Sequence, residues 1–407
     1  MVETKTTARV VIRIGGIALT RFSRVSIVRD LRDIAGSFDV TCQDVARALQ
    51  ALPVNMDRPP YMKMLRAGLT CTVEIDGETV LDGYVDATFP SYTADGMGMR
   101  IVGRDRTGDL VDCAALPSGP AEFRGVDLLH VAQTVCAPFN ISVHSETDIG
   151  APFERLAVRP HETALQFLEG AARQRSVLLV SDGVGGLLLT RGGSSRAPDG
   201  LAFGTNIWAA QAEDSWRGRF SDYYVKGQTD HRSARAGRSP ALDHDATPLA
   251  DDAEDPAYEA VESSGVLMTG HAQDPEITRW RPTVRLTRSQ SGMSSTQEQA
   301  EWMLRVARGQ GESITYTVLD WRAGGSSALW RPNQISAVDD PYADIDKDML
   351  IAGVTFTFDD KGEKTMLRVC GRTAFDRINE AERRRHRWRD RRPTAPGDSA
   401  PSPLRAP

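Results

Sequence analysis

Residues 103–112, Gly-Arg-Asp-Arg-Thr-Gly-Asp-Leu-Val-Asp, place two arginines and three aspartates within ten positions. Carboxylates beside cationic groups serve acid–base catalysis, but the same residue types also tie strand ends and subunits together. The two interpretations differ in one respect: a catalytic site is needed once, whereas an architectural feature can be copied. Arg104, Arg106, Asp109 and Asp112 are therefore candidate site residues whose role depends on whether the pattern recurs.

Other stretches that could carry chemistry are incomplete. His161-Glu162 begins like a zinc-binding H-E-x-x-H helix, but Leu165 stands where the second histidine is needed. The glycine runs at 183–186 and 192–195 lack the Lys-Ser/Thr of a phosphate-binding loop, which favours hairpin and loop glycines. A loop of carboxylates could bind calcium but lacks the EF-hand order of ligands, and its members are Asp243, Asp245, Asp251, Asp252, Glu254 and Asp255.

These observations predict no metal ion, no cofactor and no catalytic residue. Paired carboxylates for glycoside hydrolysis stay open as an alternative, because their pairing is spatial and the chain has 55 acidic residues. The sequence has no G-x-S-x-G motif that would mark a nucleophilic serine.

The composition sets the class of protein. A chain of 407 residues with 26% charged residues is typical of a globular protein of two to four domains, and its net charge of -6 argues against nucleic-acid and anionic-membrane partners. No apolar run is long enough to span a bilayer or to act as a secretory signal, which favours the cytoplasm. Five scattered cysteines predict reduced thiols rather than disulfides: Cys42, Cys71, Cys113, Cys136 and Cys370.

The elements that position the arginines and aspartates fall into four segments of an α+β, mainly β, chain. Alternating apolar residues predict a first β-barrel domain over 1–115, where Asp76-Gly77 forms a hairpin turn. Helical and strand patterns mix in an α+β domain over 116–218. A second β-barrel domain, with an inserted polar loop and a helix, follows over 219–375. The remainder, 376–407, is an Arg-rich helix and a flexible tail.

Two helices can be predicted in more detail. In the α+β domain, Leu165, Leu168 and Ala172 fall on one helical face, which we expect to be buried. In the second β-rich segment, Ser295 and Glu298 match a capping box. The apolar face that follows comprises Ala300, Met303, Leu304 and Ala307, and Gly309 is expected to end this helix.

The opening pattern does recur. Residues 65–68 (Leu-Arg-Ala-Gly) match 330–333 (Trp-Arg-Pro-Asn), since each places an apolar residue, an arginine and a turn-former before a strand. Further on, DGYVDATF is answered by IAGVTFTF, and GMRIVGRDRTGDLVD by MLRVCGRTAFD. The repeat predicts two copies of one small β-barrel that flank the α+β domain.

Duplication favours architecture over catalysis for the charged stretch. Gly103-Arg104 and Gly371-Arg372 would end equivalent strands, which makes Arg372 a further candidate site residue. We expect Arg104 and Arg106 to pair with Asp105, Asp109 or Asp112, or with a neighbouring subunit. Trp330 is expected to anchor the second barrel or its seam between subunits, while Pro332-Asn333 turns the chain into the next strand.

Five stretches, in order, resemble the baseplate hub proteins of Mu-like contractile-tailed phages: GRDRTGDLVDCA, RFSDYYVKGQ, RWRPTVRL, EWMLRVARGQGESITYTVLDWR and LWRPNQISAVDD. The resemblance covers about residues 8 to 375. It implies a homotrimer in which six barrels form a ring that joins the tail tube to the central spike, with other baseplate proteins around it. It also implies a place in the virion tail baseplate, after assembly in the host cytoplasm.

Two other functions stay open beside the structural hub. One is a tail-associated peptidoglycan hydrolase, and the other is a spike-type component of a related secretion apparatus. The run RRRHRWRDRR at 383–392 lies beyond the resemblance. It could contact phosphate backbones, dock to an acidic partner protein, or form a solvated terminal helix.

Overall fold

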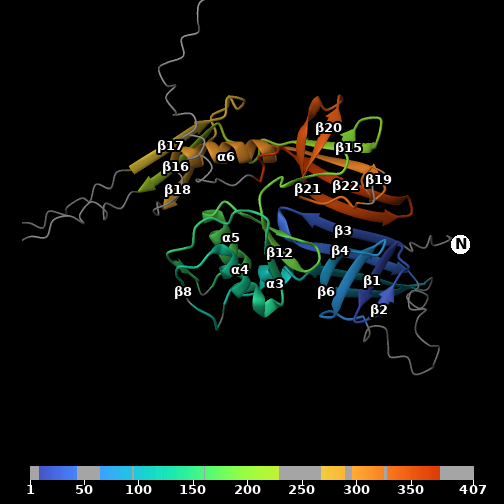
Figure 1. Ribbon diagram of the computed structural model, residues 1–407. Coiled ribbons are helices and arrows are strands. Elements are labelled where there is room, and N and C mark those ends of the chain that lie inside the picture. Colours follow the sequence, from blue (N-terminus) through green and yellow to red (C-terminus); the bar gives the residue numbers. More distant parts are fainter. Residues whose placement is uncertain are drawn as a thin grey trace, which may run out of the picture.

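The computed structural model describes residues 9–43, 65–93, 96–116, 118–120, 122–159, 161–228, 267–288, 296–324 and 328–375. The acidic loop at 243–255, Ser295 and the arginine run at 383–392 lie outside these residues. Strands dominate the described chain, as the alternating sequence predicted (Figure 1). No described helix is long and apolar enough to cross a bilayer.

The first β-rich segment forms seven strands. Its Asp76-Gly77 turn has positive φ at both residues, 50° and 81°, as a tight hairpin requires. The strands are β1 (Val10–Ile14), β2 (Ile17–Leu19), β3 (Arg24–Asp30), β4 (Asp33–Gln43), β5 (Thr70–Ile75), β6 (Glu78–Thr93) and β7 (Gly96–Asp105). They pair side by side in the order β3-β4-β7-β6-β5-β1-β2.

The second β-rich segment repeats this order. It contains β19 (Glu312–Leu319), β20 (Gln334–Asp340), β21 (Ile345–Asp359) and β22 (Gly362–Cys370), and β15 (Ile207–Asp214) pairs with β19. The order β15-β19-β22-β21-β20 matches β3-β4-β7-β6-β5, which confirms the duplication at the level of topology. The short strands β13 (Ser195–Arg196) and β14 (Leu201–Ala202) add to β20.

The two copies are joined rather than separate. Strand β21 pairs with β3, so that one 14-stranded sheet runs through both copies (Figure 1). Buried side chains from both copies form one hydrophobic core, from Val10 and Phe38 to Tyr316 and Val369. Among the described strands, no pairing closes either copy into a barrel of its own.

The α+β unit packs beside this sheet with a core of its own. Its helices are α3 (Gly108–Asp112), α4 (Leu128–Cys136) and α5 (Ala164–Gln174), capped by Asp127 at α4 and by a Thr163–Gln166 capping box at α5. Its strands are β8 (Glu122–Phe123), β9 (Ser142–Ser145), β10 (Leu156–Ala157), β11 (Leu178–Ser181) and β12 (Gly186–Thr190). The buried face of α5 includes Leu168 and Ala172 but turns Leu165 only partly inward, because Phe167 and Ala171 take the centre.

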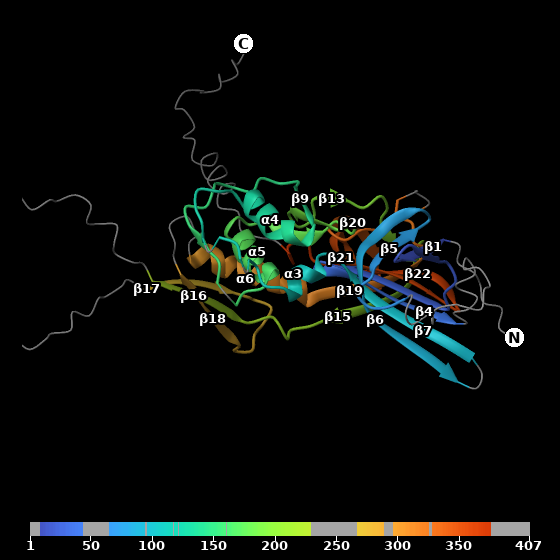
Figure 2. The same cartoon turned by 90° about the horizontal axis from the view of Figure 1, so that it is seen from below.

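A smaller layer extends from the second copy. Strands β16 (Asp222–Gln228), β17 (Leu267–Gln273) and β18 (Pro282–Arg288) form a three-stranded sheet against α6 (Thr296–Gly311) (Figures 1 and 2). The helix does not end at Gly309 as expected but continues to Gly311. Ala300 is buried on the predicted face of the helix. Four cysteines are buried, Cys42, Cys71, Cys136 and Cys370, while Cys113 is exposed.

Candidate assembly sites

The two copies can be aligned residue by residue through their backbone hydrogen bonds. Gly68 N–H donates to Val85 O over 2.8 Å, and Asn333 N–H donates to Ile351 O over 2.9 Å. Both donors have a left-handed backbone, with φ of 86° and 66°. The match of 65–68 with 330–333 that the sequence predicted therefore holds in the structure.

The same alignment corrects the expected match of the arginines. Val85 lies opposite Gly103 and Ile351 opposite Val369, and the ladder between the paired strands is irregular directly after each pair. Counting three residues on from Gly103 and from Val369 matches Arg106, not Arg104, with Arg372. The sequence match failed because it aligned the glycines at 103 and 371, which lie two positions apart in the two strands.

The ion pairs agree with this alignment. Arg106 Nη2 lies 2.7 Å from Asp82 Oδ2, and Arg372 Nη1 lies 3.9 Å from Asp348 Oδ2. Asp82 and Asp348 are themselves equivalent, because each stands three residues before the matched pair Val85 and Ile351. The same arginine–aspartate pair therefore occurs at equivalent positions of both copies, which favours a structural role for it.

Arg104, in β7, does not share the partner of Arg106 but binds two other aspartates. Its Nε lies 2.7 Å from Asp86 Oδ2, and its Nη2 and Nη1 both contact the carboxylate of Asp112, at 2.6 and 3.4 Å. Hydrogen bonds from Arg104 lower the pKa of Asp112, and half-burial beside this cluster raises the pKa of Asp109. Arg104 therefore fastens α3 to the strand pair β6–β7.

Asp105 takes no part in the arginine pairs that the sequence suggested for it. It is 2% exposed and accepts hydrogen bonds from Gly36 N at 3.0 Å and Ser181 Oγ at 2.6 Å. Thr107 contributes two more, from its N–H at 3.0 Å and its hydroxyl at 2.5 Å. Burial raises the pKa of Asp105 in spite of these donors. This one carboxyl group links β7, β4 and the α+β unit.

A glycine turn completes the contact between that unit and the first copy. Gly183 and Gly185, in the turn from β11 to β12, have φ of 84° and 90°. A Cβ atom at Gly183 would lie 2.5 Å from the Arg29 guanidinium, and one at Gly185 would lie 3.1 Å from Arg106. Side chains at these positions would meet both arginines, so the run at 183–186 serves close packing, in line with the predicted hairpin glycines.

Trp330 and Pro332 lie at the start of the second copy's repeat. Trp330 is 2% exposed within the shared core, at the position that Leu65 takes in the first copy. Pro332 precedes Asn333, whose side chain accepts from Gly193 N and donates to Arg191 O. The chain then enters β20 at Gln334.

Ion pairs bridge the two copies at their hairpin ends. Arg9 binds Asp76 in the first copy and Glu363 in the second. Arg331 Nη2 lies 2.8 Å from Glu78 Oε1, again across the two copies. These contacts reinforce the β3–β21 pairing.

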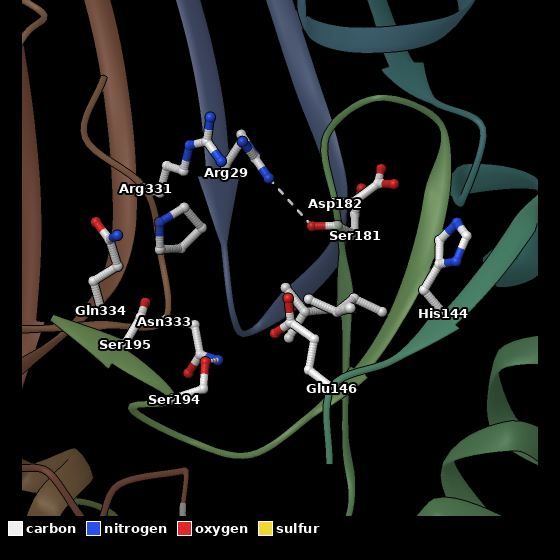
Figure 3. A pocket seen from close by; sticks show the side chains of 13 residues that line it. Arg29, His144, Glu146, Ser181, Asp182, Ser194, Ser195, Arg331, Asn333 and Gln334 are labelled. Atoms are coloured by element: carbon white, nitrogen blue, oxygen red, sulfur yellow. Dashed lines mark hydrogen bonds between the residues drawn. The ribbon is translucent and has the colours of Figure 1, made fainter. Parts of the chain in front are cut away.

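A cavity of about 390 Å³ opens where the first copy, the second copy and the α+β unit meet. Arg29 donates to Ser181 O over 3.2 Å, and burial lowers the pKa of Arg29 (Figure 3). Arg331 lies beside Arg29, while His144 and Glu146 approach from the α+β unit (Figure 3). Most of the residues that line it have polar side chains, and the full lining is Arg29, His144, Glu146, Val180, Ser181, Asp182, Leu188, Ser194, Ser195, Arg331, Pro332, Asn333 and Gln334.

One serine, one aspartate and one histidine meet elsewhere, but in the wrong order for catalysis. Ser221 Oγ donates to Asp222 Oδ2 over 2.7 Å, and His271 Nε2 lies 2.8 Å from Asp222 Oδ1. Hydrogen bonds from both partners lower the pKa of Asp222. A hydrolase triad needs the histidine between the other two, where it can take the serine proton. Within the described residues, no group of three or more potential metal ligands is present either.

Sequence reasoning missed the roles of two charged groups where the first copy meets the α+β unit, Asp105 and Arg29. Asp105 was considered only as a partner for arginines, although its place at the end of an alternating strand marks it as inward-facing. Arg29 carries no motif, and its role depends on the approach of a turn 150 residues later in the chain.

Comparison with known families gives three matches along the chain. Residues 9–105 match the N-terminal domain of the Mu phage baseplate assembly protein GpP-like family. Residues 107–191 match the second domain of baseplate hub protein gp44-like proteins, and residues 292–378 match the fourth domain of Mu phage baseplate assembly protein GpP.

Whole-chain relatives agree with these matches. Baseplate hub protein gp44 of Escherichia phage Mu is 30% identical over 387 residues, covering 94% of this chain and 92% of that protein. The crystal structure of the 43 kDa tail protein of prophage MuSo2 from Shewanella oneidensis is 30% identical with a TM-score of 0.72, covering 90% of this chain and 99% of that one. A tail protein from Neisseria meningitidis MC58 shares the fold at 22% identity, with a TM-score of 0.66 and coverage of 89% and 96%.

Proposed function

Because this chain belongs to the baseplate hub family of Mu-like phages and is a structural protein of the tail baseplate, we propose that it acts there as a trimeric symmetry adapter. In this role it joins the tail tube to the central spike and contacts other baseplate proteins. The chain assembles in the host cytoplasm before it enters the virion.

The observation that carries the proposal is the repeat itself. Each chain contains the same five-strand order twice, and the matched residues Arg106 and Arg372 keep the same carboxylate partners. Three chains with two copies each present six similar units around an axis. Such a ring can face a sixfold partner on one side and a threefold partner on the other.

The mass of the protein in solution tests the oligomeric state. Light scattering on the purified full chain should give three times 44.5 kDa. A strictly monomeric species at concentrations of tens of micromolar would contradict the trimer.

We further propose that the chain has no hydrolytic activity. The Ser221–Asp222–His271 order and the use of charged groups in fixed ion pairs support this proposal. Zymography on peptidoglycan tests it directly. Clearing by the purified protein that disappears after substitution of a single carboxylate would favour the hydrolase instead.

A further inference from the structure

The first strand of each copy has the same neighbour on one side. Strand β3 pairs with β4, which pairs with β7, and strand β15 pairs with β19, which pairs with β22. Ile27 lies opposite Phe38, and Ala212 lies opposite Ile314. Because Phe38 and Ile314 face the matched residues Gly103 and Val369, Ala212 is the counterpart of Ile27.

The two first strands differ on their other side. Strand β3 is covered by β21 through six residue pairs, and Val25 and Ile27 are buried. Strand β15 lies at the end of the sheet order, and no described strand covers its outer edge (Figure 1). Seven of its eight residues are exposed, including Ala210 and Ala212, and Trp208 is 59% exposed. An uncovered edge of this length is a template for another strand.

The strand that covers β3 also has a counterpart. The first part of β21 pairs with β20, and its second part, Gly353–Phe358, pairs with β3 on the same side. In the first copy, β5 pairs with β6 only as far as Tyr84. Beyond that point β6 pairs with β7 alone among the described strands, and Phe89 is 51% exposed. Figure 2 shows this part of the β6–β7 hairpin projecting beyond the rest of the sheet.

We propose that β15 of one chain pairs antiparallel with residues 87–93 of β6 in a second copy of the chain, in the register of the internal β21–β3 joint. Phe356 stands five residues after Ile351 and faces Ile27, and Pro90 stands five residues after Val85. Pro90 then faces Ala212, Phe89 faces Glu213, and Ser91 faces Gln211. This inference rests on the proposed ring, and it assigns the strands that form it.

A second copy fits this site because the chain itself carries both halves of the joint. The two open edges are not paired with each other within the chain, and six strands separate β15 from β6 in the sheet order. Pairing between chains is therefore head to tail, and such pairing closes into a ring when the rotation per chain allows it. Pro90 provides no N–H, so its carbonyl is the only group it can offer to the ladder.

Cysteine pairs test the strands and the register. In a Cys113→Ser background, which removes the exposed thiol, Phe89→Cys combined with Glu213→Cys should form disulfides between chains under mild oxidation. Directly opposed residues of antiparallel strands have Cα atoms about 4.5–5.5 Å apart, within the range that a disulfide spans. We expect covalent dimers and trimers on a denaturing gel to carry most of the protein.

The matched control is Phe89→Cys with Ala212→Cys in the same background. Adjacent residues of a strand point to opposite faces, so this pair should give at least tenfold less cross-linked product. A trimer by mass with no cross-linking above this control would overturn the assigned strands while leaving the trimeric hub intact. A monomer by mass without cross-linking would overturn both.

A charge placed on the edge gives an independent test. Ala212→Lys should weaken association of the chains at least tenfold, while the melting temperature of the monomer stays unchanged because Ala212 is exposed within one chain. Gln211→Lys, on the opposite face of the same strand, is the control and should have a smaller effect. Normal trimer yield in Ala212→Lys would contradict the proposed joint.

Discussion

The last residue of β7 and its counterpart after β22 show how the two copies have diverged. Asp105 in the first copy corresponds to Gly371 in the second. Asp105 binds the α+β unit through Ser181, whereas Gly371 lies so close to α6 that a Cβ atom would stand 2.9 Å from Gly309 Cα. The two copies share the same strand order, but the residue at the end of the matched strands differs because a different unit packs against it in each copy.

The charge pair next to this position diverges in the same way. Arg106 and Asp82 are 24% and 23% exposed, but Arg372 and Asp348 are 58% and 29% exposed. The first pair is covered by the glycine turn of the α+β unit, and the second faces solvent. Equivalent residues therefore need not contribute equally, which gives the comparison measurable consequences.

The largest difference between the copies is expected where each repeat begins. Trp330→Ala should lower the free energy of unfolding by about 3–5 kcal/mol, because the indole is buried in the shared core. Leu65→Ala, at the matched position, removes a smaller side chain and should cost about 2–3 kcal/mol. Denaturant unfolding of both variants measures this. Equal stability of Trp330→Ala and the wild type would show that the indole does not anchor the second copy.

Asp105→Ala should have the next largest effect. It leaves the buried donors of Gly36, Thr107 and Ser181 without their acceptor, and unsatisfied buried groups cost about 1–3 kcal/mol each. We expect a loss of about 2–4 kcal/mol, less than the sum over these donors because the Thr107 hydroxyl keeps Ile34 O as an acceptor. Proteolysis at the boundary of the α+β unit should be faster. Ser181→Ala removes one donor to Asp105 and the acceptor of the Gly183 N–H, and should cost about 1–2 kcal/mol. A larger loss in Ser181→Ala than in Asp105→Ala would refute the central role of the carboxyl group.

Acid should affect two buried carboxyl groups in opposite directions. Burial raises the pKa of Asp105, so its contribution to stability is full below the ordinary aspartate pKa and is lost as pH rises through the raised value. The second carboxyl group, Asp274, directly follows β17, is 1% exposed, and lies 2.8 Å from Arg219 Nη2 and 2.7 Å from Arg308 Nη2. Burial opposes its ionisation, but hydrogen bonds from these two arginines outweigh burial and lower its pKa. The contribution of Asp274 is thus present above the ordinary aspartate pKa and is lost as pH falls through the lowered value.

Melting temperatures between pH 7 and pH 3 separate these effects. The decrease in melting temperature of Asp105→Asn relative to the wild type should be greatest in acid. The decrease in melting temperature of Asp274→Asn should be greatest near neutral pH. Deficits that follow the same pH trend would rule out this assignment.

The smallest effect concerns the matched arginines. Arg106→Ala should cost about 1–3 kcal/mol, because Asp82 remains half-buried without its cationic partner. Arg372→Ala should cost less than about 0.5 kcal/mol, since exposed pairs contribute little. Thermal unfolding of the two variants compares them directly. Equal losses of stability would mean that the glycine turn covering Arg106 and Asp82 does not strengthen their ion pair.

The sequence was sufficient to predict the repeat and the turns that open it. The signals for the repeat are local: both copies alternate apolar and polar residues, and each has a matched stretch, Leu-Arg-Ala-Gly or Trp-Arg-Pro-Asn. The backbone hydrogen bonds of Gly68 and Asn333 confirm the match of these stretches. The predicted boundaries between the domains, at 115 and 218, stay predictions. Strand β15 precedes residue 218 and yet pairs with the second copy, which local patterns do not reveal.

The partners of charged side chains were less predictable. Arg104 binds Asp112, one of the nearby aspartates expected for it, but Arg106 binds Asp82 on the adjacent strand. A ladder irregularity shifts the register of β6 against β7 by one residue, and spacing along the chain does not report such a shift. The alternation of β7 marks Asp105 as inward-facing, but its partner Ser181 comes from a unit distant in sequence.

The ladder between β21 and β3 also determines how the molecule responds to mechanical force. Its six residue pairs lie along the strand direction, and antiparallel hydrogen bonds run perpendicular to that direction. A pull along the strands therefore loads the bonds together in shear, whereas a pull across them would open them one after another like a zipper. Tension between the two copies along this axis should meet far greater resistance than a peeling force of equal size.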